Sequence, residues 1–359
     1  MIILSTLSAA RNLIPPSDPQ FQYNGRIDRS SEKQYRFDWP GITIKAKFEG
    51  TSCAVTLSGM NCYDAFVDGV LKSTFRTGTD KESYAIAGKL TDRTHALLLV
   101  KRSESVAAPA GFYGISLDDG KKLAALDRRP NRRIEFIGDS YTAGFANEYM
   151  RQECRAGKED SIILAATNTN KAFGPIVARA FGAQYQILAI SGKGLVRNYN
   201  GIDAGRELLT YYDYTLQEAA HPANDTFRWD FSSWKANAVV IGVGINDFQG
   251  DPPYADSAAF AQRYGKLIER LRKQYPGVAI ICCATKVWPN DDLKSHVKTI
   301  VETQKKAGHN DVHYFEYVSE NGALYGHPHI HDHRKIAEKL IPVISGATGW
   351  RRTDMIRGK

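Results

Sequence analysis

Cysteine is scarce in this chain of 359 residues, which contains five cysteines. Their number and spacing match neither a disulfide-rich scaffold nor a cysteine-based metal site. Long apolar runs are missing too: no stretch reaches the roughly 18 to 20 residues that a membrane-spanning helix needs, so we expect a soluble protein. The sequence has no low-complexity tract and no internal repeat, and its hydrophobic and charged fractions, 43% and 24%, are typical of a globular protein.

The chain has 47 Lys and Arg against 39 Asp and Glu, a net charge of +8. Most of these basic residues are spread along the sequence, which argues against a nucleic-acid or membrane partner. The exception is a basic cluster, which consists of Lys121, Lys122, Arg128, Arg129, Arg132 and Arg133. We interpret the basic cluster as a solvated linker between two domains, with a phosphate-binding patch as the alternative.

The chain is longer than one hydrophobic core usually covers, so we expect two domains. At its start, Met1–Ala10 contains a short apolar run but no basic segment, and it is short for a secretory signal. Either a signal has been removed, or the chain has none.

Residues 1–127 are predicted to form an all-β sandwich. Over residues 22–126, apolar and polar residues alternate in short runs such as Ile42–Phe48, which places one face of each strand in a core. The run Tyr63–Val67 leads directly into Asp68-Gly69, a strong hairpin signal. Many short strands separated by turns, without a convincing helical pattern, favour this architecture.

Residues 128–348 follow a different pattern, in which short apolar runs alternate with amphipathic segments. The runs suited to a buried parallel sheet are Ile134–Ile137, Tyr185–Ile190, Ala238–Val243, Val278–Cys283 and Val312–Phe315. The clearest helix is expected over Asp256–Tyr275, where apolar residues share one helical face. This alternation predicts a doubly wound α/β domain with a parallel sheet, followed by a basic tail at 349–359.

Candidate catalytic residues lie in loops after three of these predicted strands, where parallel α/β sheets gather reactive groups. Ser140 follows Gly-Asp at a strand-to-helix turn, which suits a nucleophile; a helix cap is the alternative. Gly192 could present a backbone N–H, and Asn246 a side-chain amide, to a ligand oxyanion. Asp247 could cap the next segment or fix a neighbouring loop.

Four of the nine histidines lie within residues 327–333, just before the last predicted helix. Such a cluster raises a metal site as an alternative, but no distant ligands of recognised spacing support it. We interpret His327 as a general base for Ser140, because an imidazole pKa near 6.5 suits proton transfer at neutral pH. We therefore expect neither a metal nor a cofactor.

The order of these blocks along one chain resembles the SGNH (GDSL-type) hydrolases: Gly-Asp-Ser at Ser140, then Gly192, then Asn246, then His327 before a final helix. The resemblance covers about residues 133–346. It implies that Ser140 is the nucleophile and His327 the base. It also implies an oxyanion hole made by the backbone N–H groups of Ser140 and Gly192 and the side chain of Asn246.

A finer resemblance is to carbohydrate esterase family 2. The residues that carry it are Tyr23-Asn24-Gly25-Arg26-Ile27-Asp28, Trp39-Pro40-Gly41, Phe48-Glu49-Gly50-Thr51, Ile134 to Ser140, and Ser191 to Tyr199. The resemblance implies an all-β jelly-roll sandwich followed by a three-layer α/β/α SGNH-hydrolase domain. It further implies removal of acetyl groups from plant polysaccharides or acetylated sugars. Such a polymeric substrate favours a periplasmic or secreted enzyme.

Sugar rings commonly stack on exposed aromatic residues, and two candidates for this role are Trp288, in a loop after a predicted strand, and Tyr199. Packing roles are the alternative for both. Two other function classes stay open. A lipid or thioester hydrolase on the same fold would need a long apolar groove, and a non-catalytic carbohydrate-binding protein would hydrolyse nothing.

One departure from the SGNH pattern concerns the group that orients His327. Many SGNH enzymes carry an acid two or three positions before the histidine, but those positions hold Tyr325 and Leu324. Either a backbone carbonyl orients His327, or an acid comes from elsewhere. Asp332 is a candidate if the loop folds back.

Overall fold

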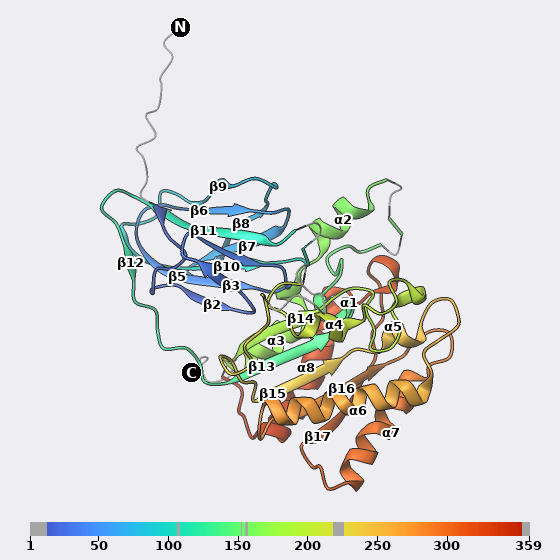
Figure 1. Cartoon of the computed structure of the whole chain (residues 1–359). Helices are drawn as coiled ribbons and strands as arrows, with labels where there is room; N and C mark the ends of the chain where they lie inside the picture. The colour runs from blue at the N-terminus through green and yellow to red at the C-terminus, as the bar shows by residue number, and fades with distance from the viewer. Residues whose placement is uncertain (1–12, 106–107, 152, 155–156, 218–225, 354–359) are drawn as a thin grey trace.

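The computed structural model describes residues 13–105, 108–151, 153–154, 157–217 and 226–353. The segment Met1–Ala10, considered above as a signal, and the end of the basic tail lie outside these ranges. Figure 1 shows a β-sandwich, coloured blue to teal, beside an α/β unit coloured green to red. None of the helices in the described part is long and apolar enough to cross a membrane.

The N-terminal unit consists of two antiparallel sheets (Figure 1). One sheet has the order β3 (Asp28–Ser31), β4 (Gln34–Phe37), β11 (Ala110–Leu117), β6 (Cys53–Ser58) and β9 (Glu82–Ala87), with β1 (Leu13–Ile14) beside β11. The other has the order β12 (Leu123–Ala124), β5 (Thr43–Gly50), β10 (Arg93–Lys101), β7 (Cys62–Val67) and β8 (Val70–Arg76), with β2 (Gln22–Asn24) beside β5.

The predicted alternation positions the core of this sandwich. On β5, Ile44, Ala46 and Phe48 are buried, whereas Lys45 between them is exposed. The predicted hairpin joins β7 to β8 through Asp68 and Gly69, whose φ angles are 52° and 79°. Both angles are positive, as the tight two-residue hairpin turn requires.

The C-terminal unit is built on a parallel five-stranded sheet, as predicted. Its order is β14 (Gln184–Ala189), β13 (Arg133–Gly138), β15 (Ala238–Gly242), β16 (Ala279–Thr285) and β17 (Val312–Tyr317). The helices are α1 (Ser140–Ala143), α2 (Glu159–Ala166), α3 (Phe173–Ala180), α4 (Leu208–Tyr212), α5 (Ile245–Phe248), α6 (Ser257–Gln274), α7 (Leu293–Lys306) and α8 (Ile330–Thr348). Because α3 packs with α8, and α6 with α7, the two pairs cover the sheet as separate layers (Figure 1).

A buried ion pair joins the two units. Arg26, in the loop after β2, lies 3.5 Å from Glu135 on β13, and both side chains are fully buried. Arg26 also donates a hydrogen bond of 3.1 Å to the carbonyl of Tyr214. Glu135 accepts hydrogen bonds from Tyr212 (2.8 Å) and Tyr275 (3.3 Å). Charges buried in this way need such partners, so the sandwich completes the environment of β13.

Candidate active site

Ser140 lies at the turn between β13 and α1, as the sequence predicted. The strand ends at Gly138, and a Cβ on this glycine would lie 2.1 Å from Thr142 Oγ1, so the helix folds closely back onto the strand end. Asp139 caps α1 by accepting a hydrogen bond of 3.1 Å from the Tyr141 N–H. Burial raises the pKa of Asp139 to about 7. The turn leaves the Ser140 side chain at the carboxyl edge of the sheet, 7% exposed.

His327 contacts Ser140 directly. Its Nε2 lies 2.9 Å from Ser140 Oγ, and its Nδ1 lies 2.8 Å from the carbonyl oxygen of Leu324. A carbonyl can only accept, so Nδ1 carries the proton and Nε2 is left as the acceptor for the serine hydroxyl. Burial lowers the pKa of His327 to about 4, which keeps the imidazole neutral at physiological pH.

The structure thus decides between the two ways of orienting His327 that the sequence left open. The backbone carbonyl of Leu324 takes this position, in a loop where Tyr325 has a positive φ of 52°. Asp332 has a different role: its carboxylate accepts from the His329 N–H (2.9 Å) and the Glu320 N–H (3.2 Å), and it caps α8. The Ser140–His327 pair is therefore a dyad held by a neutral backbone group.

The loop after β14 lies beside the Ser140 turn. The Ile190 N–H donates to the Gly138 carbonyl at 3.3 Å, so the loop that contains Ser191 and Gly192 begins beside the end of β13. Gly192 has a φ of 78°, a conformation that favours glycine. On the far side of the loop, Asn246 Nδ2 donates to the Lys193 carbonyl at 2.9 Å, so one amide hydrogen of Asn246 stays available.

Within the described part of the chain, neither the Ser140 N–H nor the Gly192 N–H donates a backbone hydrogen bond to another protein group. Backbone donors at a strand-to-helix turn that lack a protein partner are available to an acceptor on a ligand.

Asp247 fixes the loop that follows Gly192. Its buried carboxylate accepts from the N–H groups of Leu195 (2.9 Å), Val196 (2.7 Å) and Arg197 (3.0 Å). Burial raises the pKa of Asp247 to about 6, while these three bonds favour its charged form. Asp247 thus has the loop role that the sequence suggested, and it follows β15, the direct neighbour of the strand that leads to Ser140.

The sandwich contributes a residue to this region that sequence reasoning missed. Glu104, in the loop after β10, accepts hydrogen bonds from the Ser191 N–H at 2.7 Å and from Ser191 Oγ at 2.5 Å. Burial raises the pKa of Glu104. No local pattern marks this glutamate, because its partner lies 87 positions further along the chain.

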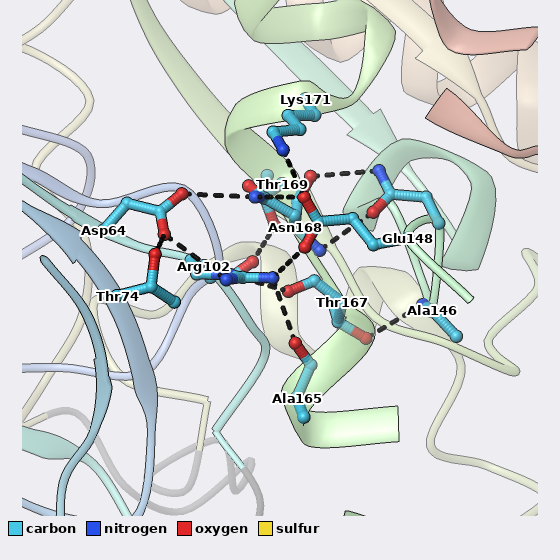
Figure 2. A network of polar contacts seen from close by, with 11 residues as sticks. Asp64, Thr74, Arg102, Ala146, Glu148, Ala165, Thr167, Asn168, Thr169 and Lys171 are labelled. Atoms are coloured by element: carbon cyan, nitrogen blue, oxygen red, sulfur yellow. Dashed lines mark hydrogen bonds and ion pairs between the residues drawn. The ribbon is translucent and has the colours of Figure 1, made fainter. Parts of the chain in front are cut away.

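A second link runs from the sandwich through Thr169 to the Ser140 helix, and Figure 2 shows the polar network around Arg102 and Thr169. Arg102, directly after β10, donates to Asp64 (3.3 Å) and the Ala165 carbonyl (3.0 Å), and it pairs with Glu148. Thr169 Oγ1 lies 2.7 Å from the Arg102 carbonyl and 2.6 Å from the Ala143 carbonyl, the last residue of α1. The same loop of the sandwich therefore holds both the helix that begins at Ser140 and the loop that contains Gly192.

His329 and His333, two other histidines of the 327–333 cluster, make contacts away from His327. The Nδ1 atoms of His329 and His333 accept from different backbone N–H groups, at residues 331 and 173. Among the residues that the structure describes, no group of three or more His, Cys, Asp or Glu side chains is arranged to hold a metal ion. The two aromatic candidates are open to solvent, with 72% of Trp288 and 41% of Tyr199 exposed.

Two family models match the chain in succession. The carbohydrate esterase 2 N-terminal model covers residues 23–126, and the GDSL-like lipase/acylhydrolase family model covers residues 136–335. The boundary between the two matches falls in the segment that joins the sandwich to β13.

Curated relatives and solved structures agree with these models. The chain is 33% identical to cellulase/esterase CelE of Acetivibrio thermocellus over 93% of its own length, but it spans 40% of that protein. It is 30% identical to an acetylxylan esterase / glucomannan deacetylase of Cellvibrio japonicus, over 95% of this chain and 94% of that one. A family two carbohydrate esterase from Clostridium thermocellum, solved in complex with cellohexaose, is 31% identical with a TM-score of 0.83, over 92% and 99% of the two chains. The chain therefore belongs to carbohydrate esterase family 2 and carries its hydrolase domain on the GDSL-like fold.

Proposed function

We propose that this protein is a serine-dependent O-acetyl esterase that removes acetyl groups from plant polysaccharides or acetylated sugars. The observation that carries the proposal is the 2.9 Å contact between Ser140 Oγ and His327 Nε2 in a member of this esterase family. The names of two relatives, acetylxylan esterase / glucomannan deacetylase, support xylan or glucomannan as the substrate class. A polymer of this kind favours a periplasmic or secreted enzyme.

The proposed reaction proceeds through an acetyl-enzyme. Ser140 Oγ attacks the acetyl carbonyl carbon while His327 Nε2 takes the hydroxyl proton. His327 then returns this proton to the departing sugar oxygen, and the acetyl group stays on Ser140. Water attacks the acetyl-serine in the second step, again giving a proton to Nε2, which releases acetate and restores the serine hydroxyl.

The negative charge of each tetrahedral intermediate needs donors placed in advance. We assign this role to the N–H groups of Ser140 and Gly192 and to the Asn246 amide. One such donor is typically worth about 2.7 to 4 kcal/mol in the transition state. The Leu324 carbonyl holds the tautomer of His327 but brings no full negative charge, so these donors carry a large part of the stabilisation.

The exposed rings of Trp288 and Tyr199 are proposed to stack on the sugar units next to the acetylated one. This role is separate from the chemistry. Replacing either ring should raise KM for a polymeric substrate and leave hydrolysis of a small acetyl ester unchanged.

The test compares the wild type with Ser140→Ala on 4-nitrophenyl acetate, acetylated xylan and acetylated glucomannan. Ser161→Ala, an exposed serine on α2, is the matched control. We expect the wild type and the control to release acetate in the presence of a chelator, and the Ser140→Ala rate to fall by at least about 1000-fold.

Other outcomes would count against the proposal. Activity that survives in Ser140→Ala, or that disappears with the chelator, would mean that Ser140 is not the nucleophile. A preference for 4-nitrophenyl octanoate over the acetate would favour a lipid or thioester hydrolase. Binding of the polysaccharides without hydrolysis of any ester would favour a carbohydrate-binding protein.

A further inference from the structure

Two adjoining cavities open where the sandwich meets the α/β unit, with volumes of about 120 and 310 Å³. They share Tyr23, Asn24 and Arg129, and together we call them the junction groove. The larger cavity falls in the size range of small-molecule sites, roughly 300 to 1000 Å³. Its lining also includes Arg29, Gln186, Trp229 and Trp234.

The junction groove is separate from the Ser140 region. Gln184, Tyr185 and Gln186 at the start of β14 line it, and β14 pairs in parallel with β13, whose opposite end leads to Ser140. A strand of this length spans roughly 20 Å. A ligand in the junction groove would therefore not touch the reacting atoms.

The charged side chains that line the junction groove are all positive. Arg29 lies 5.0 Å from the ring of Tyr23, and Arg129 donates to the Tyr23 carbonyl at 3.3 Å, so one residue holds both guanidinium groups. Lys45 and Arg179 line the smaller cavity. Within the described part of the chain, no Asp or Glu lines either cavity, and neither Arg29 nor Arg129 forms an ion pair. Desolvation and then the charge of Arg29 lower the pKa of Arg129, as expected where like charges lie close together.

Three residues of the larger cavity's wall also carry a buried polar atom that lacks a partner. Gln186 is 1% exposed, and its Oε1 has no hydrogen-bond partner among the described residues. The same holds for Asn24 Oδ1 and for Trp229 Nε1. Buried polar atoms are almost always satisfied in proteins, and a small rotation of these side chains toward the cavity would bring two acceptors and one donor to a ligand whose groups both donate and accept. Alcohol hydroxyls have this property.

We propose that the junction groove binds a hexuronate, a sugar unit with a carboxylate, as part of a polysaccharide. Arg29 and Arg129 supply the cations for the carboxylate, since guanidinium groups match its geometry. Gln186 and Asn24 accept from the ring hydroxyls, and Trp229 Nε1 donates to one. The inference does not depend on the proposed hydrolysis, because it concerns a different end of the sheet.

The proposal also changes the interpretation of the basic cluster. Lys121 is paired with Asp92 at 2.7 Å, and Arg132 lies over the ring of Trp350 at 5.4 Å and donates to a backbone carbonyl. These two residues have structural roles. Arg129 instead faces the junction groove, so the linker segment carries one ligand-binding residue rather than a phosphate patch.

The experiment is a calorimetric titration at low salt with methyl β-D-glucuronoside, methyl β-D-glucoside and inorganic phosphate. The proteins are Ser140→Ala, to remove any hydrolysis, and the same chain with Arg129→Gln or Arg128→Gln added. Arg128 is exposed and lines neither cavity, which makes it the matched control. Hydrolysis of 4-nitrophenyl acetate by Arg129→Gln with the native serine gives an independent reading of the active site.

We expect the glucuronoside to bind about tenfold more tightly than the glucoside or phosphate, and Arg129→Gln to remove this advantage while Arg128→Gln keeps it. Ester hydrolysis by Arg129→Gln should match the wild type. The proposal is overturned if glucuronoside and glucoside bind equally, if phosphate binds as well as the glucuronoside, or if Arg128→Gln has the same effect as Arg129→Gln. The titration measures binding in the Ser140→Ala background, so its result can be interpreted even if the protein is not an esterase.

Discussion

Glu104 offers the sharpest test of how the sandwich supports the Ser140 region. It is a sandwich residue, yet its carboxylate accepts two hydrogen bonds from Ser191, the neighbour of Gly192. We consider two changes. Glu104→Ala removes both bonds, and Glu104→Gln keeps an oxygen that can accept from the Ser191 N–H but removes the charge.

The expected magnitude follows from what the loop has to hold. If Gly192 supplies one oxyanion donor, its misplacement costs up to about 2.7 to 4 kcal/mol, or 100- to 1000-fold in rate. Hydrogen bonds to charged groups contribute about 1.5 to 3 kcal/mol each, so the loss of both is enough to release the loop. We expect Glu104→Ala to lower kcat for 4-nitrophenyl acetate about 100-fold and Glu104→Gln about tenfold. KM should change less, because an oxyanion donor acts mainly on the charge that develops in the transition state.

The measurement is kcat and KM for both variants, with Glu32→Ala as the control because Glu32 is exposed in the sandwich. Thermal unfolding of each variant separates a displaced loop from a loss of folded protein. A Glu104→Ala variant that keeps the kcat of the wild type would refute the reasoning, since Gly192 would then be positioned without Ser191. So would a loss of kcat that is the same in Glu104→Gln and Glu104→Ala, since the remaining hydrogen bond would count for nothing.

Three further predictions concern other parts of the same framework. Burial lowers the pKa of His327 to about 4, and a general base must be neutral to accept a proton. We therefore expect kcat/KM to stay nearly constant from pH 7.5 to 5.5 and to fall tenfold per pH unit below about 4. A pH profile of kcat/KM with its midpoint near 6.5 would contradict this. Glu135→Gln leaves Arg26 buried without a charged partner. We expect the free energy of unfolding, measured with urea, to fall by about 3 to 5 kcal/mol. An unchanged urea concentration at the unfolding midpoint would mean that the pair contributes little. Asp247→Asn weakens the three hydrogen bonds to the loop at 195–197. We therefore expect both a lower melting temperature and at least a tenfold lower kcat. A change in only one of the two quantities would show that Asp247 supports either the folded state or the loop geometry, but not both.

Much of the fold was predictable because its signals are local. The run Ile134–Ile137 became β13, and the helix expected over Asp256–Tyr275 became α6, Ser257–Gln274. Each signal depends on neighbours within a few positions, so the periodicity of apolar residues is enough to find it. The positions of Ser140 and Asn246 followed in turn, because the carboxyl ends of parallel strands meet at one edge of the sheet.

The group that orients His327 was not predictable for a different reason. An acidic residue is the usual orienting group, and position 324, where one would stand, holds an apolar leucine. The structure uses the carbonyl of Leu324, a group that every residue has and no residue type reveals. Only the conformation of the loop, with its positive φ at Tyr325, directs this carbonyl toward the imidazole.

The sandwich is best understood as part of the active-site framework. Glu104 holds the Gly192 loop, and the Arg102 carbonyl shares Thr169 with the end of the Ser140 helix. Contacts of this kind join residues far apart in sequence, so neither the sandwich pattern nor the α/β pattern contains them. Arg26 adds a third link, to Glu135 on the strand that leads to Ser140. Separating the two units would leave Glu135 without its cation and Ser191 without its acceptor, and therefore the α/β unit alone lacks the contacts that fix the loops of the proposed active site.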